Sequence, residues 1–311
     1  MSTMKAIAIN EYGGVEVLQD VEVSRPVPQA DEILVRIHAT AVNPVDWKIR
    51  AGYMSGWLQH QLPLILGCEF SGVVEALGAN IGSVKIGDEV YGSVSIARSG
   101  AYAEYVIAKE NEIAPKPKNI DHLNAAALPV GIETAWQSFK AADLRAGQKV
   151  LIHAAAGGVG SLAVQLAKAK GAYVIGTASA RNLEFVKNLG ADEVIDYTTT
   201  KFEEVVKDID VVFDLIGGET QERSFGILKK GGFLASPVSA PDAETLAKYG
   251  INGAMIVLQP NAENLKEITA LVEAGKIKTF IETVLPLSEA RKAHELSESG
   301  RTRGKIILKV K

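Results

Sequence analysis

The sequence predicts an α/β protein of two domains, in which a β-rich domain is joined to a domain built on a doubly wound parallel sheet. The chain has 311 residues, about twice the length of a typical domain of roughly 150 residues. Residues 1–121 contain short apolar runs separated by Gly and Pro, whereas residues 122–262 alternate apolar β-branched runs with helical stretches. The first pattern is typical of short strands with irregular connections, and the second of a parallel sheet covered on both faces.

The β-rich domain is predicted to be discontinuous, with residues 1–121 completed by residues 263–311. Each expected strand is an apolar run bounded by polar or turn residues. In the first segment these strands are Lys5–Ile9, Ile33–Ala41, Gly72–Leu77, Glu89–Val94 and Tyr102–Val106. In the second segment, helices are expected over Asn264–Ala274 and Ser288–Glu298. The alternation of apolar and polar residues over Lys305–Val310 then indicates a last, antiparallel strand.

The parallel-sheet domain is predicted over residues 122–262 and begins with a helix over Ala125–Ala142. Strands and helices then alternate, as a βαβ arrangement requires. The expected strands are Lys149–His153, Tyr173–Ala178, Glu193–Asp196, Val211–Leu215 and Phe233–Ser236, and the expected helices are Ser161–Lys170, Asn182–Leu189 and Phe202–Lys207. Gly250–Pro260, with its apolar run Met255–Leu258, is predicted to be the edge of this sheet.

Composition and charge exclude several classes of function. Lys and Arg total 33 against 37 Asp and Glu, a formal charge of −4, and no Lys/Arg run supplies the positive surface that nucleic-acid binding needs. Cys68 is the single cysteine, so an internal disulfide and a cysteine-based metal cluster are excluded. No run of 18 apolar residues predicts a membrane span, and Ala6–Ile9 is too short for the core of a signal peptide. We therefore expect a cytoplasmic protein with no nucleic-acid or membrane partner.

The glycine-rich segment after the strand Lys149–His153 is the most informative motif. It reads Ala-Ala-Ala-Gly157-Gly158-Val159-Gly160 and leads directly into a helix. A dinucleotide site needs such a turn, because the backbone must approach the pyrophosphate and the helix must pack closely on the strand. The free N–H groups of the helix then face the phosphates. The first glycine of the usual fingerprint is replaced by Ala155, and a turn without a ligand is the alternative interpretation.

The end of the following strand indicates which dinucleotide binds. An acidic residue there would accept hydrogen bonds from the ribose 2′-hydroxyl, but the stretch Val174–Arg181 has no Asp or Glu. Ser179 and Arg181 can instead donate to a 2′-phosphate, which favours NADPH over NADH. The alternative is that Arg181 is a solvated surface residue. Further cofactor contacts are expected at strand ends, from Thr177, Tyr197 and Gly217.

Several segments, in their order along the chain, resemble the zinc-independent quinone and enone reductases of the medium-chain dehydrogenase/reductase superfamily. The resemblance covers essentially the whole chain, through Ala41–Asp46, Gly67–Gly72, Gly87–Gly92, Tyr102–Tyr105, Lys116–Ile120, Leu128–Pro129, Ala154–Gly160, Leu189–Asp192 and Gly304–Lys305. It implies a GroES-like catalytic domain and a Rossmann domain, with the active site between them, and a homodimer. Zinc-dependent relatives have a cysteine at Asn43, a histidine at Cys68 and a cysteine near Val130, so no metal is expected.

The resemblance also implies roles for individual residues. Asn43 is expected beside the nicotinamide, with its amide donating to a substrate oxygen. Lys48 is expected to reach the cofactor ribose or the developing oxyanion, and Tyr53 to contact substrate and act as a proton donor. The alternatives are an asparagine in an Asn-Pro turn, a surface lysine and a loop aromatic residue. Further contacts to the cofactor are expected from Thr134, Gly304 and Lys305.

The chemistry expected without a metal is hydride transfer from NADPH to an activated acceptor. Oxidation of an ordinary alcohol would lack the Lewis acid that stabilises its alkoxide. In a quinone or an α,β-unsaturated carbonyl compound (an enone or enal), the charge moves onto an oxygen that hydrogen-bond donors can stabilise. Two alternatives are an enoyl-thioester reductase and a non-catalytic NADPH-binding sensor or structural protein.

Overall fold

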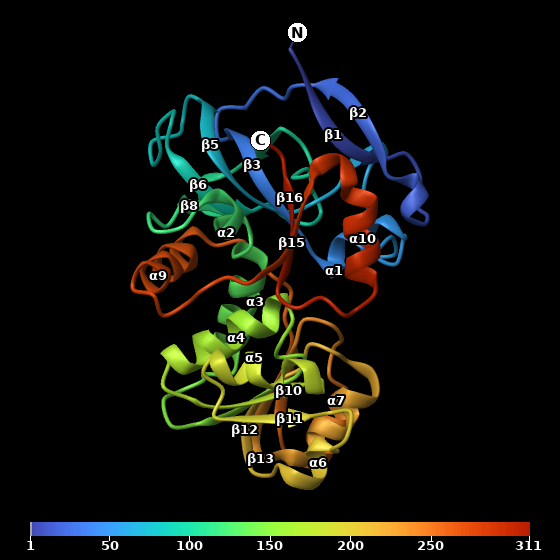
Figure 1. Cartoon of the computed structure of the whole chain (residues 1–311), viewed down its shortest axis with the longest axis vertical. Helices are drawn as coiled ribbons and strands as arrows, with labels where there is room; N and C mark the ends of the chain where they lie inside the picture. Colours follow the sequence, from blue (N-terminus) through green and yellow to red (C-terminus); the bar gives the residue numbers. More distant parts are fainter. Residues whose placement is uncertain (1) are drawn as a thin grey trace. The chain divides into compact units, whose positions relative to one another are not determined.

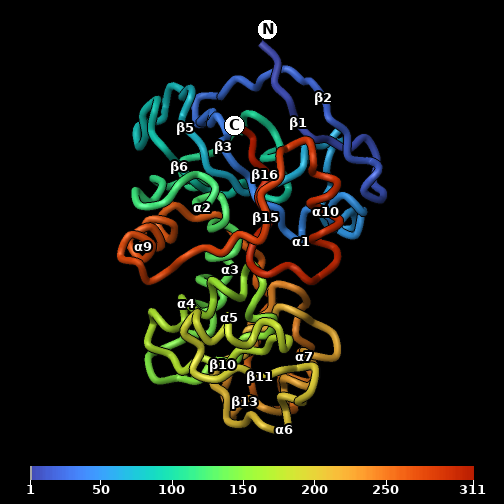
Figure 2. The backbone as a smooth tube through the Cα atoms, viewed as in Figure 1, coloured from blue at the N-terminus to red at the C-terminus, as the bar shows by residue number. Residues whose placement is uncertain are grey.

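The computed structural model describes residues 2–311. The chain folds into two compact units. The β-rich unit contains the chain up to Val130 together with Gln259–Ala274 and Thr279–Lys311, and the parallel-sheet unit contains Gly131–Leu258 and Gly275–Lys278. In the backbone trace, the red C-terminal segment lies among the blue N-terminal strands of the β-rich unit (Figure 2). This unit is therefore assembled from segments that are far apart in the sequence.

The β-rich unit contains two sheets (Figure 1). Its strands are β1 (Thr3–Ile9), β2 (Gln19–Ser24), β3 (Ile33–Val42), β4 (Leu64–Ile65), β5 (Glu69–Leu77), β6 (Glu89–Ser93), β7 (Tyr105–Ala108), β8 (Ile113–Pro115), β15 (Ile281–Pro286) and β16 (Lys305–Lys309), and its helices are α1 (Pro44–Arg50), α2 (His122–Ala126), α9 (Ala262–Glu273) and α10 (Ala290–Glu298). The larger sheet has the order β15-β16-β3-β5-β6-β8, with β7 paired to residues 33–36 of β3, and the smaller sheet has the order β2-β1-β4. The last strand, β16, pairs antiparallel with β3, as the sequence predicts.

Strand β3 lies at the centre of this unit and is buried along most of its length. Its apolar residues belong to several core clusters. In one of these clusters, Ile37 packs with Phe70. At Ala39 and Ala41 the side chains are small, and Ala126 and Ala127, at the end of α2, pack against them. Residues 122–130 therefore belong to the β-rich unit, whereas the sequence-based division had assigned them to the parallel-sheet domain.

The parallel-sheet unit has six strands within residues 149–255, in the order β11-β10-β9-β12-β13-β14, and every pair is parallel. The strand order reverses at β9, and ligands bind at such a reversal in open α/β sheets. This arrangement confirms the predicted Rossmann fold class. The strands are β9 (Lys149–Ile152), β10 (Tyr173–Ala178), β11 (Glu193–Asp196), β12 (Ile209–Phe213), β13 (Leu228–Ser236) and β14 (Asn252–Met255), and the helices are α3 (Pro129–Ala141), α4 (Gly158–Ala169), α5 (Leu183–Asn188), α6 (Phe202–Val205), α7 (Gly218–Ser224) and α8 (Ala243–Tyr249).

Two expected elements differ in the structure. The helix predicted over Ala125–Ala142 is interrupted, because α2 ends at Ala126 and α3 begins at Pro129. Proline has no N–H group, and its ring disfavours the helical conformation at the residue before it. The strand predicted over Tyr102–Val106 begins only at Tyr105, since the backbone of Tyr102 bonds to Ile7 and Leu66 instead. Short 3₁₀ turns lie at Val15–Val17, Glu110–Glu112, Ala180–Asn182, Phe225–Ile227 and Leu287–Glu289.

Candidate active site

Asn43 lies at the junction of β3 and α1, and the local sequence explains its position. Its backbone is extended (φ −119°, ψ 151°), which makes it the N-cap of α1, and Pro44 follows at the first helical position. Both residue types are favoured there. Asp46 Oδ2 accepts the Asn43 backbone N–H at 2.8 Å. The strands and helices predicted from the sequence do not include this short helix, although the Asn-Pro-Val-Asp pattern carries its signal.

The Asn43 carboxamide is held at both ends by buried charged side chains. Lys305 Nζ donates to Oδ1 at 2.6 Å, and Nδ2 donates to Glu69 Oε1 at 2.7 Å. Lys305 and Glu69 also form an ion pair at 2.5 Å, while the second oxygen of Glu69 accepts the Val130 N–H at 2.8 Å. Asn43 is only 3% exposed and Glu69 is completely buried. Because an ammonium only donates and a carboxylate only accepts, these partners determine which end of the amide is the oxygen.

A second hydrogen-bonded chain runs from Asp46 to the surface. Tyr102 OH donates to Asp46 Oδ2 at 3.0 Å, and His294 Nε2 lies 3.3 Å from the Tyr102 oxygen. Arg50 Nη1 lies 3.3 Å from His294 Nδ1 and 2.6 Å from Glu298 Oε1. Since arginine only donates, Nδ1 is the acceptor and Nε2 carries the proton. Burial, aided by the Arg50 charge, lowers the pKa of His294 to about 3, so the imidazole is neutral. These hydrogen bonds could not be predicted from the sequence, because α1, α10 and the segment after β6 come together only in the folded protein.

Cys68 packs beside Asn43, but the surrounding groups do not form a metal site. Its Sγ lies 4.0 Å from Asn43 Nδ2 and 3.8 Å from Asp46 Oδ1. Burial, with the nearby carboxylates of Asp46 and Glu69, raises the pKa of the Cys68 thiol well above its usual range, so the sulfur stays protonated. Among residues 2–311, no group of three or more His, Cys, Asp or Glu side chains is arranged to hold a metal ion. These residues therefore do not fit a catalytic zinc ion.

Lys48 and Tyr53, the other predicted catalytic residues, meet at Trp47. The Lys48 ammonium lies 5.7 Å from the centroid of the Trp47 ring, and the Tyr53 ring contacts the same indole edge-on at 6.1 Å. Tyr53 is 74% exposed. The structure thus brings the partly buried Lys48 and the exposed Tyr53 to the same tryptophan, while Asn43 is held in its buried cluster.

The glycine-rich turn connects β9 to α4. Gly157 is the N-cap of α4, so the N–H groups of the first helical turn have no partners within the helix. A Cβ at Gly160 would lie 2.2 Å from the Ala154 carbonyl oxygen, so the helix can approach the turn only with glycine there. Ala155, at the first glycine position of the motif, fits because Gly176 on β10 leaves space beside it; a Cβ at Gly176 would lie 2.9 Å from that of Ala155. At Gly157 a Cβ would meet only the Ala154 oxygen, at 3.4 Å. The turn therefore has the open space at its helix N-terminus that a dinucleotide phosphate requires.

Thr177, predicted to contact the cofactor, is buried and uses its hydroxyl within the fold. Its Oγ1 lies 3.2 Å from His153 Nδ1, while His153 Nε2 lies 2.9 Å from Ser224 Oγ. Ser224 donates its own proton to the Thr220 carbonyl, so His153 Nε2 is the donor and Nδ1 accepts from Thr177. Burial lowers the pKa of His153 to about 4, so this imidazole is also neutral.

Four other predicted cofactor residues follow the carboxyl ends of strands in the parallel sheet, and so lie on one side of it. Ser179 and Arg181 follow the carboxyl end of β10, and Tyr197 follows that of β11; the two strands are neighbours. Arg181 and Tyr197 are exposed. Gly217 follows β12, next to β9, and its N–H is accepted by Asp214 Oδ1 at 2.9 Å. This side of the sheet also carries the glycine-rich turn.

Thr134, Gly304 and Lys305 have different surroundings. Thr134 is buried within α3 rather than at its start, and its carbonyl accepts the Ser138 hydroxyl. Gly304 has φ +74°, and a Cβ there would lie 2.1 Å from the Phe280 carbonyl oxygen, so glycine is required by the fold itself. Lys305 is the buried partner of Asn43 already described.

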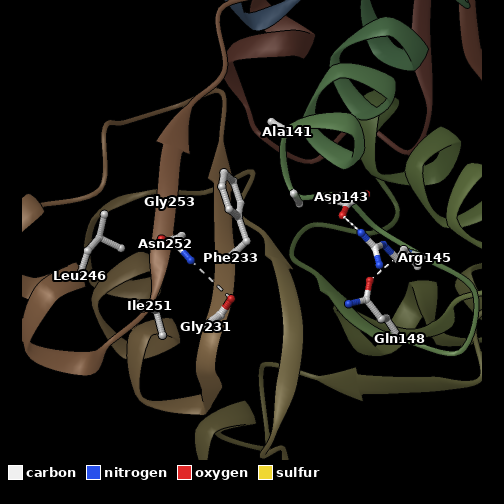
Figure 3. Close-up of a pocket in the computed structure, with 11 residues that line it drawn as sticks. Ala141, Asp143, Arg145, Gln148, Gly231, Phe233, Leu246, Ile251, Asn252 and Gly253 are labelled. Carbon is white, nitrogen blue, oxygen red and sulfur yellow. Dashed lines mark hydrogen bonds and ion pairs between the residues drawn. The ribbon is translucent and has the colours of Figure 1, made fainter.

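A cavity of about 650 Å³ lies in the parallel-sheet unit but holds none of the predicted site residues (Figure 3). Gln148 precedes β9 and Asn252 begins β14, so this cavity lies at the amino ends of these strands. The glycine-rich turn lies on the opposite side, at the carboxyl ends of the strands. Its charged lining residues, Asp143 and Arg145, pair with each other and are exposed. The cavity is therefore separate from the candidate cofactor side of the sheet.

Comparisons with known proteins agree with this architecture. Residues 29–118 match the alcohol dehydrogenase GroES-like domain, and residues 189–308 match the zinc-binding dehydrogenase family. A 2-methylene-furan-3-one reductase of Solanum lycopersicum is 36% identical over 99% of this chain and 79% of its own length. An NADPH-dependent alkenal/one oxidoreductase of Arabidopsis thaliana is also 36% identical, over 98% of this chain and 79% of its own.

Solved structures are similar over the same extent. The quinone oxidoreductase of Coxiella burnetii has a TM-score of 0.93 and 38% identity, with both chains fully covered. The Escherichia coli quinone oxidoreductase, solved with NADPH, has a TM-score of 0.90 and 31% identity over 99% of this chain and 100% of its own. Within residues 2–311, no helix has the length and apolar character needed to cross a membrane. From its sequence relatives and its fold, the chain belongs to the medium-chain dehydrogenase/reductase superfamily.

Proposed function

We propose that the protein is an NADPH-dependent oxidoreductase that reduces quinones or α,β-unsaturated carbonyl compounds without a metal ion. The observation that carries the proposal is the buried Asn43 carboxamide, which replaces a metal ligand by a neutral hydrogen-bond donor fixed beside Lys305 and Glu69. Relatives named alkenal/one oxidoreductase and quinone oxidoreductase support the same substrate class.

The cofactor part of the proposal rests on the β9–α4 turn. Gly158 and Val159 would bind the pyrophosphate through backbone N–H groups at the start of α4, while Gly157, whose own N–H donates to the Ala154 carbonyl at 3.0 Å, would leave the space for it. Ser179 and Arg181 would receive the 2′-phosphate, which supports NADPH in preference to NADH. When bound, the reduced nicotinamide supplies the hydride.

The chain's own residues act on the charge that the acceptor gains. An N–H of Asn43 donates to the acceptor oxygen, where negative charge develops as the double bond is reduced. The burial of Asn43 keeps water from competing for that bond. Tyr53 is exposed, so its hydroxyl can exchange its proton with water and pass one to the reduced product.

A substrate panel tests the proposal. The purified protein is mixed with NADPH and, separately, with a quinone, an enone, an enal and an enoyl-thioester, while the absorbance of reduced nicotinamide is followed. Rapid oxidation with quinones, enones or enals is the expected result. Turnover confined to the thioester would identify an enoyl-thioester reductase. Tight NADPH binding with no turnover on any acceptor would identify a sensor or structural protein.

The cytoplasmic location and the homodimer stay predictions. Strand β14 lies at the edge of the parallel sheet and bears the half-exposed Met255, which supports pairing with a second copy. Light scattering on the purified protein tests the homodimer.

A further inference from the structure

One N–H proton of the Asn43 carboxamide has only a weak acceptor, the Cys68 sulfur, which a carbonyl oxygen can replace. Glu69 accepts one proton of Nδ2 at 2.7 Å, and the other proton points to the Cys68 sulfur, with Nδ2 and Sγ 4.0 Å apart. That distance is at the limit even for a sulfur contact. At the other end, Lys305 occupies Oδ1 at 2.6 Å. If the amide turned over, its N–H groups would face the Lys305 ammonium and its oxygen would face the Glu69 carboxylate.

We propose that Glu69 and Lys305 are positioning residues, which hold the Asn43 carboxamide in a single orientation so that its remaining N–H is donated to the carbonyl oxygen of the acceptor. The inference rests on the proposed function, in which charge develops on that oxygen. The ion pair acts through Asn43, and neither Glu69 nor Lys305 needs to touch the substrate. Donation from the ammonium to Oδ1 also polarises the amide and strengthens its N–H as a donor.

Burial makes this arrangement effective. Glu69 is completely buried and Lys305 is 5% exposed, so water does not screen the two hydrogen bonds that orient the amide. The Asn43 backbone is fixed independently by its bond to Asp46, at 2.8 Å. A donor that is already oriented does not have to reorganise when charge appears, and loss of one such donor typically costs about 10²–10³-fold in kcat.

A double-mutant cycle in the full-length protein with NADPH and an enone or quinone tests whether Lys305 acts through Asn43. We expect Lys305→Met to lower kcat by about 10–100-fold with a small change in KM for the acceptor. In an Asn43→Ala background the same substitution should change kcat by less than about threefold, because the group it positions is gone. Glu69→Gln should follow the same pattern, and Lys305→Arg should recover part of kcat.

Lys116 supplies a matched control for the loss of a buried ammonium. Its side chain is 6% exposed, as is that of Lys305, and Nζ donates to the carbonyls of Pro117 and Ile120. Lys116→Met should lower Tm by several degrees, although less than Lys305→Met, which leaves the Glu69 carboxylate buried without its counter-ion; the carboxylate paired with Lys116, that of Glu89, is exposed. Its kcat should remain within about twofold of the wild-type value, since Lys116 has no link to Asn43.

A spectroscopic measurement tests the positioning without turnover. In ¹⁵N-labelled protein, the two side-chain amide protons of Asn43, assigned by their absence in Asn43→Ala, should have distinct shifts and exchange slowly with water. In Lys305→Met and Glu69→Gln, the shifts should converge and exchange should accelerate, whereas Lys116→Met should leave them unchanged.

Two results would overturn the inference. One is a full Lys305→Met effect on kcat in the Asn43→Ala background. The other is an effect confined to the KM for NADPH, which would make Lys305 a cofactor-binding residue. Failure of the proposed function looks different, because the wild-type protein itself would not oxidise NADPH with any acceptor.

Discussion

At the residue scale, the candidate site depends on buried polar side chains whose partners leave them few alternatives. Asn43, Glu69 and Lys305 satisfy one another, and neither charge is left unpaired. Removal of one partner of such a buried pair typically costs about 3–5 kcal/mol, because the remaining charge stays buried. The position of Asn43 was predictable from its resemblance to a known motif, but its partners were not, since Glu69 and Lys305 are far apart in the sequence.

Cofactor selectivity is a property of single residues and gives a first prediction. Arg181→Ala should raise the KM for NADPH by about tenfold or more, because a charge-assisted hydrogen bond to the 2′-phosphate contributes about 1.5–3 kcal/mol. The KM for NADH should change by less than about twofold, since NADH has no 2′-phosphate. Steady-state kinetics with both cofactors measure this difference, and equal changes would contradict the assignment.

At the scale of elements, the unit of β9, the glycine-rich turn and α4 joins fold and binding in one segment. Gly157 and Gly160 serve different purposes there. Gly160 lets the helix approach the Ala154 carbonyl, whereas Gly157 leaves open space at the helix N-terminus. The sequence motif showed both glycines but could not show that Gly176, on the neighbouring strand, makes room for Ala155.

This difference predicts that two alanine substitutions affect different properties, one stability and the other NADPH binding. Gly160→Ala should lower the free energy of unfolding by about 1–3 kcal/mol, because its Cβ would lie 2.2 Å from the Ala154 oxygen. Gly157→Ala should leave stability almost unchanged and weaken NADPH binding, since its Cβ enters the space for the phosphate. Urea unfolding and calorimetric titration with NADPH separate the two effects. A Gly157→Ala variant that binds NADPH normally would rule out the turn as the phosphate site.

At the scale of the whole molecule, buried ionisable groups determine how stability depends on pH. Burial lowers the pKa of His153 to about 4 and that of His294 to about 3, from 6.5 in the unfolded chain. Below pH 6.5 these two histidines therefore bind protons in the unfolded chain but stay neutral in the folded protein. Stability falls as the pH falls. Asp46 acts in the opposite direction, since burial raises its pKa from 3.8 to about 7.

We therefore predict that Asp46→Asn changes the pH profile in a defined way. Between about pH 4 and 7, the folded wild-type protein holds the Asp46 proton that the unfolded chain has lost, so this residue contributes less stability as the pH rises. Asparagine cannot ionise. The free energy of unfolding of the variant, relative to that of the wild type, should increase by up to about 1.4 kcal/mol per pH unit over this range. It should not increase further above pH 7. Urea unfolding at pH 5, 6, 7 and 8 measures the difference, and a constant difference would contradict the raised pKa.

The sequence by itself determined the fold class, the β9–α4 turn and the identity of Asn43 as a candidate donor. The fold class and the turn depend on local patterns, such as hydrophobic periodicity and glycines at a fixed spacing after a strand, whereas the role of Asn43 came from the family resemblance. The succession of strands and helices along the chain follows from the same local alternation. The interruption at Pro129 is also local, although the prediction of a continuous helix overlooked it.

Only the tertiary structure decided what surrounds Asn43. Glu69 begins β5, Lys305 begins β16, and Tyr102 and His294 come from two further segments, so their contacts join residues up to 262 positions apart. The tertiary structure also places the Thr177 hydroxyl in a hydrogen bond with His153. It brings Lys48 and Tyr53 to the same Trp47 ring. The physical reason is that burial and hydrogen-bond pairing depend on which segments pack together, and no local pattern in the chain encodes that packing.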